Sequence, residues 1–115
     1  MIEHFKSISE LIAGLKGLKQ EAWIHTDVEA WLSNPQKAEF YYVPWDYVQS
    51  LEDDEVFLND DGLELPLVLR DKNLKEWMLV NVLAHISNSI SWEKAGPQEF
   101  IDQVNYYLEF DTFKR

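Results

Sequence analysis

The segment NDDG, residues 59–62, is the pattern in this chain that comes closest to a metal-binding loop. An EF-hand loop for Ca²⁺ has carboxylate ligands at its first and twelfth positions and a glycine at its sixth. With Gly62 at the sixth position, Phe57 and Val68 occupy the first and the twelfth. Neither side chain can bind Ca²⁺, so we interpret residues 59–62 as a turn in which Gly62 supplies a positive φ angle.

Other residue types that support catalysis form no recognisable motif. The three histidines, His4, His25 and His85, share no short spacing, and the chain has no cysteine for a thiol nucleophile, a disulfide or a Cys-ligated metal. Its four glycines form no phosphate-binding loop, and no nucleophile elbow is present. We expect His85 to pack on a helix in line with Trp77 and Asn81. The sequence therefore predicts a protein that is not an enzyme, with no cofactor and no metal.

The charge of the chain is strongly negative and unevenly placed. Residues 38–69, here called the acidic segment, contain nine acids and no Lys, Arg or His, and hold −9 of the formal net charge of −11. Nucleic-acid binders need a basic surface to replace phosphate counterions, so we expect neither nucleic acid nor an anionic membrane as a partner. A concentrated negative charge instead steers basic proteins towards it.

Large aromatic residues accompany these acids in the stretch WDYVQSLEDDE, residues 45–55. Interfaces are enriched in such side chains, which bury much area and lose few rotamers. We predict that a partner binds a group of residues here called the docking set: Trp45, Asp46, Tyr47, Glu52, Asp53, Asp54, Glu55, Asp60 and Asp61. In the alternative interpretation Trp45 and Phe57 belong to the core and only Tyr47 is exposed.

The first half of the chain predicts one helix and two strands. Ser7 and Glu10 have the spacing of a capping box, and apolar residues follow at helical spacing as far as Leu18. Residues 22–26 and 38–44 have the composition of strands, and the second is apolar enough to be central in a sheet. Pro44 ends that strand, and residues 45–51 are expected to form a helical turn.

The second half predicts one strand and two helices. Leucine alternates with other residues over residues 63–69, which is strand periodicity, and Pro66 places that strand at an edge. From residue 74 an apolar pattern predicts a buried helix that runs to about residue 86, with Asn73 and Glu76 as its cap. Gly96 and Pro97 open a last helix. Its predicted buried stripe is Phe100, Ile101, Val104, Tyr107 and Leu108.

Together these elements predict one α+β domain spanning residues 1–115. Its sheet is expected to be small and antiparallel, with about three strands, an N-terminal helix and two C-terminal helices packed on it. The start of the chain lacks the apolar run of a secretory signal, and no stretch approaches the ~18 consecutive apolar residues of a membrane span. We therefore expect a cytoplasmic protein with no membrane partner.

Three stretches resemble a known group of proteins: SISELIAGLKGL at residues 7–18, NDDGLELPLVL at residues 59–69 and EFIDQVNYYLEFDTF at residues 99–113. They are similar to small acidic bacterial domains of an uncharacterised family, some encoded beside polymorphic toxins, and to immunity proteins of contact-dependent growth inhibition systems. The resemblance implies a protein that binds a cognate toxin domain, in many cases a nuclease with a basic cleft, and neutralises it.

Two other functions stay open at this stage. One is a non-enzymatic adaptor or regulatory protein that binds another basic partner, and a homodimer is compatible with it. The other is an enzyme whose site is assembled from residues scattered along the chain, which a deep polar pocket with converging histidines and carboxylates would support.

Overall fold

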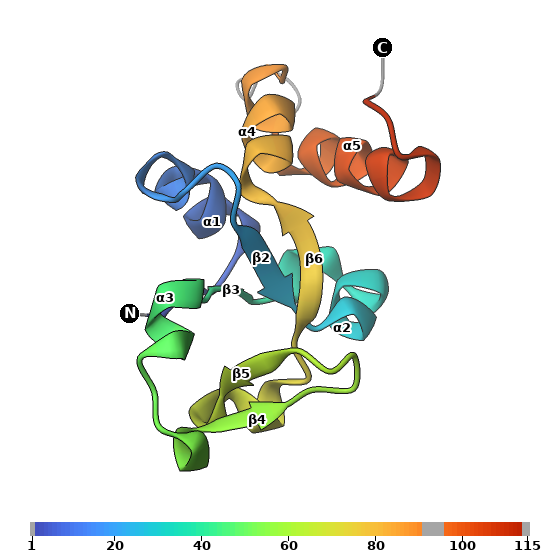
Figure 1. The fold of residues 1–115 in the computed structure, drawn as a ribbon. Helices are drawn as coiled ribbons and strands as arrows, with labels where there is room; N and C mark the ends of the chain where they lie inside the picture. Colours follow the sequence, from blue (N-terminus) through green and yellow to red (C-terminus); the bar gives the residue numbers. More distant parts are fainter. Residues whose placement is uncertain (1, 91–95, 114–115) are drawn as a thin grey trace.

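The computed structural model describes residues 2–90 and 96–113. Four strands form an antiparallel sheet in the order β1-β3-β2-β6 (Figure 1). These strands are β1 (Glu3–Phe5), β2 (Trp23–Thr26), β3 (Phe40–Tyr42) and β6 (Lys75–Leu79). A separate antiparallel hairpin consists of β4 (Val56–Leu58) and β5 (Glu64–Pro66). The predicted α+β class is confirmed, with one strand more in the main sheet than expected.

Helices lie between the strands and follow the last of them. The α-helices are α1 (Ile8–Gly14), α2 (Val28–Ser33), α3 (Trp45–Gln49), α4 (Val80–Asn88) and α5 (Gly96–Phe110). Short 3₁₀ helices are η1 (Leu15–Gly17), η2 (Pro35–Lys37), η3 (Asp53–Glu55) and η4 (Leu67–Lys72). Figure 1 shows α1, α4 and α5 at one end of the molecule, and α3 with the β4–β5 hairpin at the other.

Side-chain caps start the first two α-helices. Ser7 caps α1 as predicted, because its Oγ accepts a hydrogen bond from the backbone N–H of Glu10 at 3.2 Å. The Glu10 carboxylate accepts in return from the N–H of Lys6 at 2.6 Å. Helix α1 nevertheless ends at Gly14 and continues as the 3₁₀ turn η1, so Leu18 lies outside the helix. Asp27 caps α2, which the sequence analysis did not predict.

The helix predicted from residue 74 begins six residues later than expected. Residues 75–79 instead form β6, an outer strand of the sheet, where Met78 pairs with Ile24. Asn73 adopts a left-handed conformation (φ 54°), which separates η4 from the strand. Helix α4 then starts at Val80, whose N–H donates to the carbonyl oxygen of Ala22 at 2.9 Å. Pairing with β2 therefore overrides the helical pattern of this stretch.

The strand predicted over residues 63–69 is also shorter than expected. Gly62 forms the predicted turn with φ +80°, and β5 pairs only with β4, as expected for an edge. The ladder stops at Pro66, which has no N–H to continue it, and the chain turns into η4. Because η4 changes the periodicity, Leu67 is exposed although the strand pattern placed it on the same face as the buried Leu65 and Leu69.

Apolar side chains collect on both faces of the main sheet. Phe40 and Tyr42 of β3 belong to a main core of nineteen buried residues shared with α1, α2, α4, α5 and the other strands. Tyr41, between them, points to the opposite face, as strand alternation requires. There it joins a minor core of six buried residues: Tyr41, Val43, Val48, Leu65, Leu69 and Leu74. Most of the acidic segment folds on this minor core.

Helix α5 buries Phe100, Ile101 and Val104 as predicted. The rest of the predicted stripe is less buried: Tyr107 is half-buried and Leu108 is 44% exposed. Figure 1 shows the end of α5 extending away from the sheet, while Tyr107 still packs against the edge of the main core.

Candidate functional site

One face of the main sheet carries a row of titratable side chains, one from each strand. Strand register aligns His4 of β1 with Tyr41 of β3, Tyr41 with His25 of β2, and His25 with Glu76 of β6. Residues opposite each other in antiparallel strands project to the same face, so the four side chains are neighbours. This is the face that bears the minor core, since Tyr41 belongs to it.

At the β1 end of the row, the side chains are well paired. The His4 and Tyr41 rings stack with centroids 4.4 Å apart and planes 2° from parallel. The Nε2 atom of His4 lies 2.6 Å from the Oε1 atom of Glu39. Burial, and then the negative charge of Glu39, raise the pKa of Tyr41 above its usual value of 10.0, so its hydroxyl is protonated at neutral pH.

The next member of the row, His25, has no such partner. Its side chain is only 5% exposed, and neither ring nitrogen has a hydrogen-bond partner among the described residues. Burial lowers the pKa of His25 from 6.5 to about 4, so the imidazole is neutral at pH 7. An unpaired buried polar group costs roughly 1–3 kcal/mol of stability. The imidazole of His25 is such a group on this face of the sheet.

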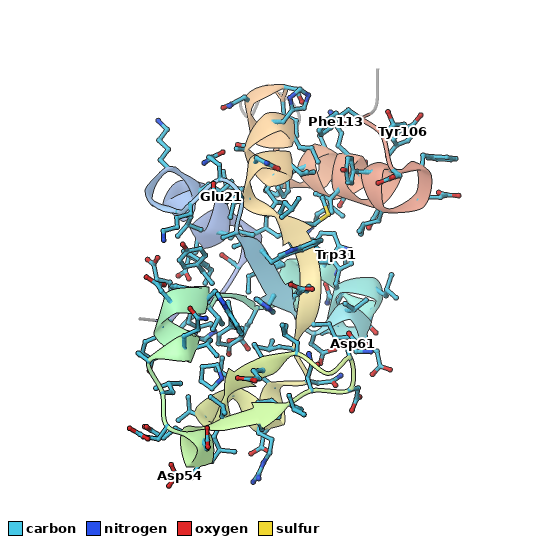
Figure 2. The ribbon with its side chains drawn as sticks, viewed as in Figure 1. Glu21, Trp31, Asp54, Asp61, Tyr106 and Phe113 are labelled. Atoms are coloured by element: carbon cyan, nitrogen blue, oxygen red, sulfur yellow. The ribbon has the colours of Figure 1, made fainter. Side chains whose placement is uncertain are left out.

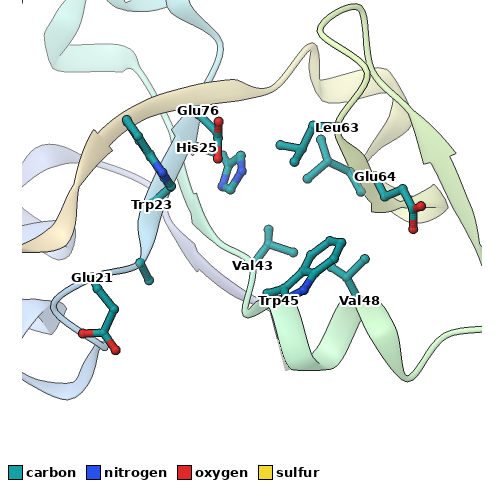
Figure 3. A pocket seen from close by; sticks show the side chains of 11 residues that line it. Glu21, Trp23, His25, Val43, Trp45, Val48, Leu63, Glu64 and Glu76 are labelled. Atoms are coloured by element: carbon teal, nitrogen blue, oxygen red, sulfur yellow. The ribbon is translucent and has the colours of Figure 1, made fainter.

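A pocket of about 340 Å³ opens beside His25, between the main sheet and the elements of the acidic segment. Its apolar wall belongs to the minor core and its surroundings and consists of Val43, Val48, Leu63 and Leu65. Two tryptophans flank it, Trp23 of β2 at 39% exposure and Trp45 of α3 at 54%. Figure 3 shows the imidazole of His25 projecting into the space between them. We call this site the indole pocket.

Three carboxylates give the indole pocket its charge. Glu76 lies beside the imidazole of His25, while Glu21 and Glu64 lie at opposite ends of the rim with their carboxylates directed outwards (Figure 3). No Lys or Arg lies among the described residues that line it. The pocket therefore combines an apolar wall, two indoles and a negative rim, a composition typical of a ligand site.

The titratable groups of the indole pocket are the imidazole of His25 and the carboxylates of Glu21, Glu64 and Glu76. The described lining residues of the pocket include no hydroxyl, thiol or amine that could act as a nucleophile. A general base works best with a pKa near the working pH, and the pKa of about 4 for His25 lies far below neutrality. Within the described part of the chain, no three His, Asp or Glu side chains are placed to hold a metal ion.

The structure divides the docking set into three groups. Trp45, Asp46 and Tyr47 lie on α3, and Trp45 lines the indole pocket. Glu52 precedes η3, which contains the next three acids, while Asp60 and Asp61 lie in the β4–β5 turn. Figure 2 shows Asp54 and Asp61 near opposite ends of the hairpin. The acids of η3 and of the β4–β5 turn therefore do not form one patch.

All seven acids of the docking set are exposed, whereas its aromatic residues differ. Trp45 is exposed and Tyr47 is half-buried, so the interpretation that placed Trp45 in the core is wrong. Phe57 is half-buried and packs against the minor core. Some acids have local neighbours: Glu55 accepts from the N–H of Glu52 at 3.0 Å, and Asp60 shares a shallow pocket with Arg70 and Lys75.

Three residues of the indole pocket were not predicted from the sequence. Trp23 and His25 are two apart in a predicted strand, and this spacing is the signal that both side chains share one face. Glu76 was assigned to a helix, which hid its position opposite His25 in the sheet. His85 lies on a helix as predicted, one turn after Asn81 on α4, but Trp77 belongs to β6 and is not in line with them. The ring centroid of His85 lies 3.9 Å from that of Phe113.

No helix in the described part of the chain is both long and apolar enough to cross a membrane. Comparison of the chain with models of known protein families, with curated proteins and with solved structures found no match.

Proposed function

We propose that this protein is an immunity protein, which binds a basic bacterial toxin domain and neutralises it. The surface that binds the toxin carries the docking set and is centred on α3 and the indole pocket. The proposal combines the sequence resemblance with the position of the charge. It assigns the protein a stoichiometric binding role in the cytoplasm, with no catalysis of its own.

The observation that carries the proposal is the state of the acids in the docking set. All seven are exposed, and the only ion pair within 4 Å in residues 2–90 and 96–113 is His4 with Glu39. These carboxylates are therefore free to meet basic side chains of a partner. Exposed charges of one sign raise association rates and make them sensitive to salt.

Trp45 supplies the apolar anchor of the proposed interface. It is exposed on the first turn of α3, beside Asp46 and at the mouth of the indole pocket. Tryptophans that insert between partners contribute a large share of the binding energy when surrounding polar contacts exclude water. We expect Trp45→Ala to accelerate dissociation of the toxin by ~30-fold or more, an effect of about 2 kcal/mol.

The proposal is tested by co-expression with a toxin domain encoded immediately upstream of this gene. A 1:1 complex is expected in size-exclusion chromatography at ~0.15 M salt, loosening at ~0.5 M salt as screening shortens. Asp53→Lys with Asp54→Lys should slow association and flatten its salt dependence. The matched control is Asp102→Lys with Glu109→Lys on α5, which makes the same charge change at the other end of the molecule.

Two results would count against the proposal. If the toxin forms no complex and stays lethal in cells that make this protein, the immunity function is wrong. A stable complex with a different basic protein would then favour the adaptor function. If both double variants slow association equally, net charge and not the docking set determines the rate.

A further inference from the structure

The indole pocket contains a polar group that the proposed docking function does not yet use. His25 is only 5% exposed and has two unpartnered ring nitrogens, yet it lies at a pocket between the main sheet and the acidic segment. A buried imidazole without a partner costs stability, and a ligand that pairs with it recovers that free energy on binding. The pocket thus has an unmet hydrogen-bonding capacity at its floor.

Charge at the pocket selects a cation. Glu76 is the cross-strand neighbour of His25, and the other two carboxylates at the rim add to the negative field. The acidic segment, which supplies one side of the pocket, holds most of the net charge of the molecule. An anionic ligand would be repelled by all of these groups, whereas a cation is attracted by them.

The two indoles and the apolar wall select the shape of that cation. Indole faces attract cations, and an arginine guanidinium both stacks on an aromatic face and is more weakly hydrated than an ammonium group. Trp23 and Trp45 flank the pocket, and the apolar wall can cover the aliphatic part of a long side chain. A guanidinium also has five N–H donors, enough to bind a carboxylate and an imidazole together.

Access to His25 requires a small rearrangement. Each ring nitrogen has less than 1 Å² of accessible surface, so a ligand reaches one only when an exposed neighbour moves. Glu76 and Trp45 are both exposed and lie at the pocket, so a rotamer change in either is compatible with the fold. Binding is therefore expected to shift the signals of these residues and of His25 together.

The geometry points to the indole pocket as a receptor for one arginine side chain of the protein partner. The guanidinium stacks on Trp45, pairs with the carboxylate of Glu76 and donates one N–H to His25. The aliphatic stem of the arginine lies on the apolar wall. The identity of the donor rests on the docking function proposed above, whereas the preference of the pocket for a guanidinium can be measured on this chain alone.

The first experiment titrates the isolated protein with N-acetyl-arginine amide and follows the imidazole of His25 and the indole N–H signals by NMR. Saturable shifts are expected at Trp23, Trp45 and His25. The lysine analogue should bind more weakly, and the neutral citrulline analogue at least ~10-fold more weakly, because it keeps the shape and loses the charge. Citrulline binding equal to that of arginine, or no shift at these residues, would overturn the proposal.

Variants locate the charge that matters. Glu76→Gln keeps the size of an exposed side chain and should weaken binding of N-acetyl-arginine amide ~10-fold or more. Glu109→Gln on α5 makes the same change in net charge far from the pocket and should leave binding unchanged. If the two variants weaken binding equally, the probe senses only overall charge and the pocket has no specific role.

The same variants separate this inference from the docking function. In one outcome, Glu76→Gln leaves the dissociation rate of the partner complex unchanged, while Asp53→Lys with Asp54→Lys slows its association. This result would support the docking surface and contradict the arginine site. In the other outcome, the arginine probe binds but the protein forms no complex with a basic protein. This result would support the arginine site and contradict the docking function.

Discussion

The main core and the minor core lie on opposite faces of one sheet and differ in almost every physical respect. Nineteen described residues from both ends of the chain build the main core, whereas six residues, all between positions 41 and 74, build the minor core. The minor core supports short elements that carry most of the net charge. The molecule thus separates its larger core from the exposed acids of the proposed docking set.

This separation has a consequence for how each region responds to change. Long-range contacts tie the main core together, so its loss should unfold the whole chain. The minor core is local and small, so its opening can be partial. Substitutions in each region test this difference, and the largest loss of stability is expected in the main core.

The largest effect is expected at Phe40, in the centre of the main core. Its ring is completely buried and contacts Trp31 and Trp77, with centroids 6.1 Å and 5.0 Å away. Phe40→Ala removes these contacts and leaves a cavity, so the free energy of unfolding should fall by about 3–5 kcal/mol. Urea denaturation followed by circular dichroism measures it. A loss of about 1 kcal/mol or less would show that the core collapses around the truncated side chain.

Leu65 offers the corresponding test in the minor core. It is 1% exposed on β5, and Leu65→Ala should lower stability by about 2–4 kcal/mol. Amide hydrogen exchange should accelerate in β4 and β5 while α4 keeps its protection. The matched variant Leu83→Ala, fully buried on α4, should instead accelerate exchange throughout the sheet. Uniform acceleration in both variants would mean that the two cores unfold as one unit.

The fold illustrates which parts of this division can be predicted from sequence. Local signals were sufficient where a few residues fix the structure, such as the Ser7 cap and the turn at Gly62. They failed at residues 75–79, where a helical apolar pattern becomes β6 because an edge of β2 is open to pairing. Strand pairing over about fifty residues has no local signature, so it could not be predicted from this stretch alone.

The candidate site shows the same limit more clearly. Trp45 was found from its neighbours in the sequence, since acids and aromatics adjoin there. His25 and Glu76 meet only through strand register and a register shift beside His25, which are properties of the folded sheet. The docking set, conversely, lies close together in the sequence, within residues 45–61, but is divided among α3, η3 and the β4–β5 turn. Adjacency in sequence therefore overstates how compact a surface is.

His25 lies where the two regions meet, and its titration tests their coupling. Its pKa falls from 6.5 in the unfolded chain to about 4 in the folded protein, so the unfolded state binds the proton more readily between these values. Stability is full above pH 6.5 and should decrease by about 3 kcal/mol as the pH falls to 4. His25→Gln removes this contribution.

The measurement is the difference between the pH–stability curves of the wild type and His25→Gln. Glu21, Glu64 and Glu76 line the pocket beside His25 and are present in both proteins, so their contributions largely cancel. Tyr41, the neighbour on β3, stays protonated across this range because its pKa is raised. Parallel curves between pH 4 and 6.5 would contradict a neutral buried His25 and indicate that water or a counter-ion reaches it.

The smallest effect comes from a pair of glycines, one in each region. Gly62 has φ +80° in the β4–β5 turn, whereas Gly17, at the end of η1, has an ordinary φ, and a Cβ atom at either position would meet open space. Gly62→Ala should therefore cost about 1–2 kcal/mol through backbone strain alone, while Gly17→Ala should gain about 0.4–1 kcal/mol by restricting the unfolded chain. Chemical denaturation of the two variants measures both changes in the free energy of unfolding.

If the acidic segment opens independently, the loss of stability in Gly62→Ala should appear as faster amide exchange in β4 and β5 with little change in the global transition. A global loss of the full amount would instead show that this turn, despite its distance from the main core, is part of the same cooperative unit.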